Sequence, residues 1–188
     1  MIDLPEYPSP AGATPGLLDF GAFLTPSLGG PVQRVERMIS PGRYDINADR
    51  WVACVRTFTF VGKDFTGATF NSEIRLTKDA TGAALVTLTN AAAGAQGLRV
   101  VAVYTDTVAN HIANGHLNEV PPGYKLTDTV TLTEVALRVN EVTMESLPFP
   151  GERGNDATLQ WDLHITPTGG LKDKYLGGDF VVRAGATQ

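Results

Sequence analysis

Two segments of the chain alternate cleanly between apolar and polar residues. Residues 69–77 place apolar side chains on one face and polar ones on the other, with Phe70, Ile74 and Leu76 opposite Asn71, Glu73 and Arg75. Residues 158–166 repeat the pattern, with Leu159, Trp161, Leu163 and Ile165 opposite Gln160, Asp162 and His164. A period of two residues is typical of a strand with one buried face and one wet face. Both segments therefore predict strands that bury an apolar face against a second layer.

The chain after residue 50 continues as short apolar runs separated by turn residues. We predict strands at 51–61, 68–77, 83–89, 97–104, 128–134, 136–143, 157–166 and 174–184. The segments 78–82 and 168–170 end in glycine, and we predict that each closes a hairpin. Residues 105–127 form a long connection with one helical turn, and residues 144–150 form a short turn closed by prolines. Because long ordered connections are often functional, we regard residues 105–127 as a candidate functional segment. The pattern predicts an all-β fold, an antiparallel β-sandwich over residues 51–188.

Residues 1–50 differ from the remainder in composition. Prolines and glycines recur throughout and exclude a long helix or a central strand. The stretch nevertheless carries apolar residues that a solvated linker would lack, namely Leu17, Leu18, Phe20, Phe23 and Leu24. We expect an extended Pro/Gly-rich N-terminal arm that docks these residues on its own sandwich or on a neighbouring subunit. We predict that these residues make the intersubunit contacts.

Composition narrows the classes of function. The net charge is −5 and basic residues are scattered singly, which argues against a nucleic-acid partner. The single cysteine, Cys54, lies in an apolar run and is expected to be a small buried side chain. The N-terminus lacks the pattern of a signal peptide, and no segment is long and apolar enough to span a bilayer. We therefore expect a protein made in the cytoplasm, with no membrane partner.

The histidines do not predict a metal site. His111 and His116 are five residues apart in a connection, which is not the spacing that places two ligands on one helical face. His164 lies on the wet face of its strand and is expected to be a surface residue. The glycine-bounded segment 62–67 lacks the spacing of a phosphate-binding loop and is interpreted as a turn. We expect no metal site, no cofactor-binding site and no cofactor.

Acidic and aromatic residues leave two weaker possibilities open. Glu152, Asp156 and Asp162 include carboxylates that could pair as in a glycosidase, although the wet face of a strand is the simpler interpretation of Asp162. An exposed Trp51 or Tyr124 could stack on a sugar. Trp161, in contrast, lies on the apolar face of its strand and is expected in the core. No nucleophile is paired with a base, so we expect no catalytic residues and no enzyme.

Several motifs resemble those of a known family. They include an aromatic strand at 56–60, the segment 64–75 ending in Ile74-Arg75, a hairpin from Asp79 to Gly82, and closing stretches at 147–148, 159–165, 174–182 and 185–187. Together they resemble the N-terminal domain of phage baseplate upper proteins and related prophage minor tail proteins. The resemblance covers about residues 50–188. It implies an immunoglobulin-like sandwich that attaches fibres or receptor-binding proteins to the virion, without a cofactor.

The N-terminal stretch carries a second resemblance. Residues 2–5 and 29–35 are similar to the start of small prophage tail-region proteins of α-proteobacteria, but residues 38–41 depart from their pattern. The sequence thus predicts a structural virion protein of a tailed bacteriophage, in the tail, baseplate or fibre attachment, acting through protein-protein contacts. Its expected partners are other virion proteins and further copies of itself. The alternative is a carbohydrate-binding β-sandwich module for a host surface glycan.

Overall fold

The computed structural model describes residues 23–26, 33–36, 42–78, 80–148 and 154–184. The strands are β1 (Phe23–Pro26), β2 (Gln33–Glu36), β3 (Gly42–Arg43), β4 (Ile46–Asp49), β5 (Cys54–Val61), β6 (Thr69–Arg75), β7 (Val86–Thr89), β8 (Gly97–Thr107), β9 (Thr129–Val139), β10 (Ala157–Thr166) and β11 (Asp173–Arg183). The helices are α1 (Val108–Ala113) and α2 (Glu141–Ser146). The all-β prediction is confirmed, since both helices are short.

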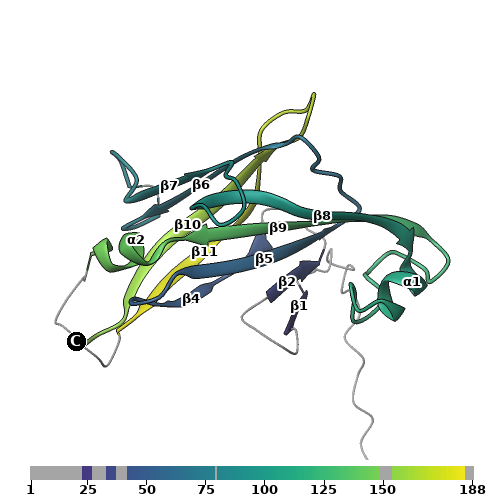
Figure 1. Cartoon of the computed structure of the whole chain (residues 1–188), viewed down its shortest axis with the longest axis horizontal. Coiled ribbons are helices and arrows are strands. Elements are labelled where there is room, and N and C mark those ends of the chain that lie inside the picture. The colour runs from purple at the N-terminus through teal and green to yellow at the C-terminus, as the bar shows by residue number, and fades with distance from the viewer. Residues whose placement is uncertain (1–22, 27–32, 37–41, 79, 149–153, 185–188) are drawn as a thin grey trace, which may run out of the picture.

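Two sheets pack against each other (Figure 1). The larger sheet has the order β3-β11-β10-β6-β7, with β4 also on β11, and the smaller sheet has the order β5-β9-β8. The hairpins pair antiparallel, whereas β3 and β4 run parallel to β11. At one side the sheets approach each other through a bridge between Asn90 and Leu98. β3 to β11 therefore form a β-sandwich whose strand pairs are antiparallel except where β3 and β4 meet β11, and β1 and β2 form a separate two-stranded sheet.

The predicted pair of strands at 128–134 and 136–143 is wrong. β9 is one continuous strand, paired along its whole length with β8 and, from Leu132 to Val139, with β5. The side of β9 that is buried changes along the strand, because Val130 and Leu132 face a small second core while Val135, Leu137 and Val139 face the other sheet. Because the apolar positions shift by one residue between Leu132 and Val135, the sequence pattern resembles two strands separated by a turn. Residues 141–146, expected in part as a turn, form α2.

The main core lies between the sheets and contains an aromatic cluster. Phe58 and Trp161 stack with their rings 5.8 Å apart, and Tyr44 meets both edge-on. The indole Nε1 of Trp161 donates a hydrogen bond to the Tyr44 carbonyl at 2.8 Å. Phe60, Phe65 and Tyr175 form a second set of edge-on contacts. Trp161 is buried, as its place on the apolar face of 158–166 predicts.

Residues 42–50, which we included in the N-terminal arm, form part of the sandwich. β3 and β4 pair with β11, and Tyr44, Ile46 and Ala48 lie in the main core. The guanidinium of Arg50 is buried and donates hydrogen bonds to the carbonyls of Leu147, Glu145 and Pro148, just after α2. The sandwich therefore begins before residue 51. The alternation of Tyr44, Ile46 and Ala48 with polar residues has the period of a strand, but we assigned it to the arm because prolines and glycines dominate the residues before it.

The long β8–β9 hairpin projects beyond the larger sheet and carries α1 at its end (Figure 1). Here the connection folds back on the outer face of the smaller sheet and encloses the small core, formed by Val61, Val108, Leu117, Val130 and Leu132 with Tyr104, Ile112 and Tyr124 against it. Thr107 caps α1 by accepting a hydrogen bond from the Asn110 N–H at 3.2 Å. The expected helical turn in residues 105–127 is thus α1.

Candidate functional site

The two cleanly alternating segments are neighbours in the structure. β6 and β10 pair so that Asp162 lies opposite Glu73 and Gln160 lies opposite Arg75. Their polar faces join into one surface on the outer side of the larger sheet. This surface continues across β11 to β3, where Gly177 pairs with Arg43. We call Arg43, Glu73, Arg75, Gln160, Asp162 and Asp179 the charged ladder, and we take it as the candidate site.

Arg75 connects β6 to the turn that follows it. Its Nε and Nη2 donate to the same Glu73 oxygen, Oε2, at 2.9 and 2.7 Å, so two guanidinium donors converge on one carboxylate oxygen of the ion pair. Its Nη1 donates to the carbonyls of Ala80 and Gly82. Paired donors of this kind hold a guanidinium in one orientation. Arg75 therefore fixes the β6–β7 hairpin as well as neutralising Glu73.

A second ion-pair network lies at the β3 end of the ladder. Arg43 Nη2 donates to Asp179 Oδ2 at 2.8 Å and also contacts Asp45, and Gln160 donates to the other Asp179 oxygen. Asp45 Oδ1 accepts the backbone N–H of Asp179 at 2.9 Å. Asp45, and then Asp179, raise the pKa of Arg43. The charges of Arg43, Asp45 and Asp179 at the β3 end of the ladder are therefore paired with one another.

An open groove of about 330 Å³ runs between these two networks. Gly177 and Gly178 lie along it, and Gly178 is needed for the close approach of the Tyr44 backbone, just after β3, to β11. A Cβ on Gly178 would collide with the backbone of Tyr44, and one on Gly177 would meet the Lys174 ammonium and the Trp161 carbonyl. Lys78 and Lys174 also border the groove. Its lining is therefore polar and charged.

Asp162 lies between the networks. Its Oδ1 is 3.6 Å from His164 Nδ1, and neither atom has a hydrogen-bond partner among the described residues. Asp162 also lies opposite Glu73, and like charges in such a pair repel each other across a sheet. The Arg75–Glu73 pair offsets this repulsion. The surface offers hydrogen bonds and charges to a partner, without a nucleophile held by a base.

The structure brings His111 and His116 together, which their spacing did not predict. The two Nδ1 atoms are 3.4 Å apart, and His111 Nε2 lies 3.1 Å from the Val130 carbonyl. His116 stacks on Tyr104 with the rings 4.0 Å apart. No third His, Cys, Asp or Glu of the described residues completes a metal-ligand group with them. The pair therefore belongs to the small core and connects α1 to β9.

Of the remaining candidate carboxylates, the described one, Asp156, is bound elsewhere than at Asp162. Asp156 accepts the backbone N–H of Ala184 at 3.0 Å, which ties the start of β10 to the end of β11. Glu152 lies outside the described residues. The partner that sequence reasoning did not consider for Asp162 is Glu73. Since Glu73 is already held by Arg75, the two carboxylates form part of a structural network.

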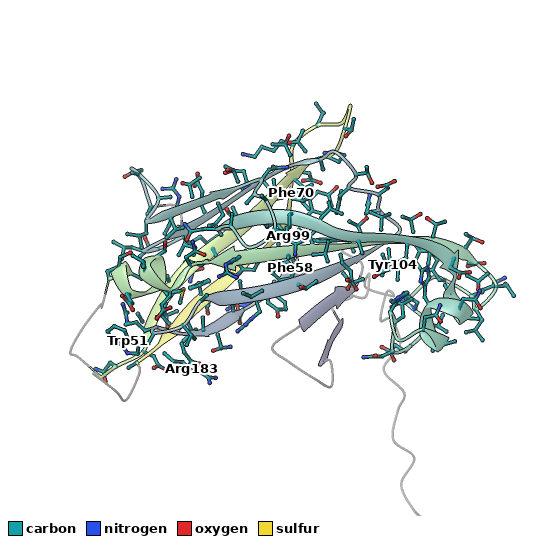
Figure 2. The ribbon with its side chains drawn as sticks, viewed as in Figure 1. Trp51, Phe58, Phe70, Arg99, Tyr104 and Arg183 are labelled. Carbon is teal, nitrogen blue, oxygen red and sulfur yellow. The ribbon has the colours of Figure 1, made fainter. Side chains whose placement is uncertain are left out.

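The candidate aromatic residues lie away from the charged ladder. Tyr124 packs on the small core, with its hydroxyl over Gly62, which has φ +72°. Trp51 is half-buried at the opposite end of the molecule from Tyr104, near Arg183 (Figure 2). Neither lines the groove. Cys54 is buried as expected, and burial raises the pKa of its thiol.

The sequence missed Arg43 and Asp179, with their partner Asp45, because they come together through a strand pairing distant in sequence. One signal was available. Adjacent glycines inside a strand often mark the close approach of another backbone, and Gly177-Gly178 mark the contact with β3. The predicted turn at 62–67 is confirmed, with positive φ at Gly62 and Gly67 and an Asp64 carboxylate that accepts the Thr66 N–H.

Among the described residues, no helix is long and apolar enough to cross a membrane. A comparison of the chain with protein-family models gives no match, and a comparison with curated proteins gives none either.

Proposed function

We propose that this chain is a structural protein of a tailed-bacteriophage virion, in the tail, the baseplate or the fibre attachment. The observation that carries the proposal is the charged ladder, in which the arginines are paired with carboxylates of the same surface. Such a surface is hydrophilic, and its described residues include no nucleophile held by a base. It suits contact with other proteins better than chemistry on a small molecule. The protein acts through its surfaces, without catalysis and without a cofactor.

The fold we propose is immunoglobulin-like, and the strand order supports this. With β3 and β4 as the first strand, the larger sheet contains strands corresponding to A, G, F, C and C′ in the order β3/β4-β11-β10-β6-β7. The smaller sheet then contains B, E and D in the order β5-β9-β8. Immunoglobulin-like domains divide their strands between two sheets in this way. The stacked pair Phe58 and Trp161 joins β5 to β10, the strands corresponding to B and F.

The N-terminal arm has a place in the same proposal. Leu17, Leu18 and Phe20 lie outside the described residues, and Phe23 and Leu24 lie in β1, which pairs with β2. β2 contacts β5 of the same chain, so the described part of the arm lies on its own sandwich. Our proposal is that the remainder of the arm before residue 42 docks on a neighbouring subunit of the particle. Deleting residues 1–41, which keeps β3 and β4, is expected to leave a folded chain that no longer enters the particle.

The groove favours one alternative, a carbohydrate-binding module. Its polar lining could donate and accept hydrogen bonds with glycan hydroxyl groups. Stacking aromatics, which sugar sites commonly use, are missing from its described lining, since Trp161 is buried there. We therefore rank this function second.

The test is to locate the protein. Particles purified from producing cells are probed with a labelled antibody against this chain and viewed by negative stain, and their proteins are identified by mass spectrometry. Label at the tail or its tip is expected. The purified chain is applied in parallel to a glycan array, with Asp162→Asn as the matched groove variant. Absence from particles together with glycan binding that Asp162→Asn weakens would replace the proposal by its alternative.

A further inference from the structure

β8 is an edge strand with one long unpaired side. It pairs with β9 over its whole length, and on its other side the described residues contribute only the bridge from Leu98 to Asn90. Val101 and Val103 are 42% and 36% exposed. Soluble proteins usually protect such edges with charged side chains, proline, a β-bulge or a covering segment. Residues 99–107 contain neither lysine nor proline, but they carry a bulge at Val101 and two charges, Arg99 and Asp106. The β8 edge is therefore open only to a strand that accommodates the bulge and complements both charges.

A β-bulge sets which side chains share a face of β8. Arg99 pairs with Ala136, Ala102 with Glu134, and Asp106 with Val130, whereas Val101 has no partner. Because the bulge adds one residue, Arg99 and Asp106 lie on the same face although they are seven apart. Val103 pairs with Thr133 and faces the opposite side. The strand therefore carries a cation near one end and an anion near the other on a single face.

We propose that the β8 edge pairs antiparallel with the β8 edge of a second copy, about a two-fold axis at Val103. A two-fold contact of this kind uses the same surface on both copies. Val103 then lies beside its own equivalent, and Ala102 lies opposite Tyr104. The bulge at Val101 is opposed by one residue, Thr105. Arg99 of each copy consequently meets Asp106 of the other, on the same face.

The charges at both positions are available for this contact. No ion pair involving Arg99 occurs among the described residues, and Arg99 lies on β8 well away from α1 (Figure 2). Asp106 Oδ1 accepts hydrogen bonds from Asn110 and Thr107, which lower the pKa of its carboxyl, and its Oδ2 faces no described partner. Asp106 is therefore ionised at neutral pH. A strand with this charge pattern is complementary to itself when antiparallel, which favours a second copy over an unrelated partner.

The first experiment uses charge swapping on purified protein. Arg99→Asp alone and Asp106→Arg alone each place like charges opposite each other twice in a two-fold dimer. Each variant is expected to weaken the dimer by more than about tenfold in sedimentation velocity or native mass spectrometry. A mixture of the two variants restores both opposite-charge contacts and is expected to form a heterodimer. Arg138→Asp, on the central strand β9, serves as the matched control and should dimerise like the wild type.

The second experiment tests the register. The only native cysteine, Cys54, is buried, so an introduced cysteine reports on its own surroundings. Val103→Cys places two thiols side by side at the axis and is expected to form a disulfide-linked dimer under mild oxidation. Thr105→Cys lies on the same face but is displaced from the axis, and Val142→Cys is on α2. Both should crosslink much more slowly.

Two outcomes overturn the inference. One is a wild-type chain that remains monomeric at high concentration, with Val103→Cys crosslinking no faster than Val142→Cys. The other is a dimer that is lost on deleting residues 1–41 but is unaffected by either charge reversal, which would assign the contact to the arm. The inference names one surface for the self-association expected of the proposed virion protein. Because it is tested on the isolated chain, its failure leaves the particle experiment unaffected.

Discussion

The core between the sheets and the small core under α1 differ in how they are assembled. The main core takes residues from nearly every strand of the sandwich, and its centre is the set of ring contacts around Trp161. The small core takes residues from β5, from the end of one hairpin and from the connection that folds back on it. Its polar component is a pair of histidines, one of them buried. The main core therefore depends on contacts between residues distant in sequence, whereas the small core depends mostly on contacts within residues 104–132.

This difference suggests two levels of cooperativity. A core shared by many strands is lost only when the whole domain unfolds, whereas a core at the end of a hairpin can open locally. Opening the small core would expose α1 and the end of the β8–β9 hairpin without separating the sheets. The predictions below test whether the molecule unfolds in this order.

The largest effect is expected in the main core. Trp161→Ala removes the ring that stacks on Phe58 and the hydrogen bond to the Tyr44 carbonyl. Because a large cavity remains between the sheets, we expect a loss of about 3–5 kcal/mol in the free energy of unfolding. Urea unfolding followed by circular dichroism measures it. Thr158→Ala, an exposed position on the same strand, should change stability by less than about 0.5 kcal/mol. Equal effects at both positions would contradict the assignment of the core.

A smaller and local effect is expected in the small core. Leu117 is 1% exposed, and Leu117→Ala leaves a cavity against Val108 and Leu132. We expect a cost of about 2–4 kcal/mol to local stability. Hydrogen exchange should speed up at the amides of α1 and remain slow in β10 and β11. Leu126→Ala, at an exposed position of the same connection, is the control. Faster exchange throughout the sandwich would mean that the two cores unfold as one.

The third prediction concerns pH and Tyr44 in the main core. Burial raises the pKa of Tyr44 from 10.0 to about 12. The folded state therefore favours the neutral phenol, and the stability this provides is complete below pH 10 and is lost as pH rises toward 12. Between these values the wild type should lose about 2 kcal/mol more than Tyr44→Phe. Urea unfolding of both chains across this range measures the difference, and parallel curves would contradict it.

The alternation of apolar and polar residues predicted the features that depend on a single strand, namely which of its faces is buried and which is wet. The wet faces of 69–77 and 158–166 and the burial of Trp161 follow from a period of two, and these segments supply four of the six residues of the charged ladder. The pairing of β6 with β10 does not follow, because alternation fixes which face is buried but not which strand lies alongside. Arg43 and Asp179 reach the ladder only through such a pairing.

The continuity of β9 could not be predicted because its two ends pack into different cores. β9 buries opposite faces at its two ends, so its sequence resembles two strands. His111 and His116 meet because α1 ends and the chain turns back at Gly115, where φ is +72°. A spacing rule for a regular helix cannot anticipate that turn. Likewise, the alternation at residues 44–49 is short and follows a Pro/Gly-rich stretch, and the pairing of β3 and β4 with β11 is distant in sequence.

The smallest effect is expected on the charged ladder. The Arg75–Glu73 pair is partly exposed, with about a quarter of each side chain accessible. Glu73→Gln breaks this ion pair but also removes the repulsion with Asp162, so we expect a loss below about 1 kcal/mol in urea unfolding. Arg75→Met should cost more, about 1–2 kcal/mol, because the carbonyls of Ala80 and Gly82 also lose their donor. Lys78→Gln is the control for a simple change of charge. If Glu73→Gln cost as much as Leu117→Ala, the ladder would be a principal source of stability, and its description as a contact surface would have to be abandoned.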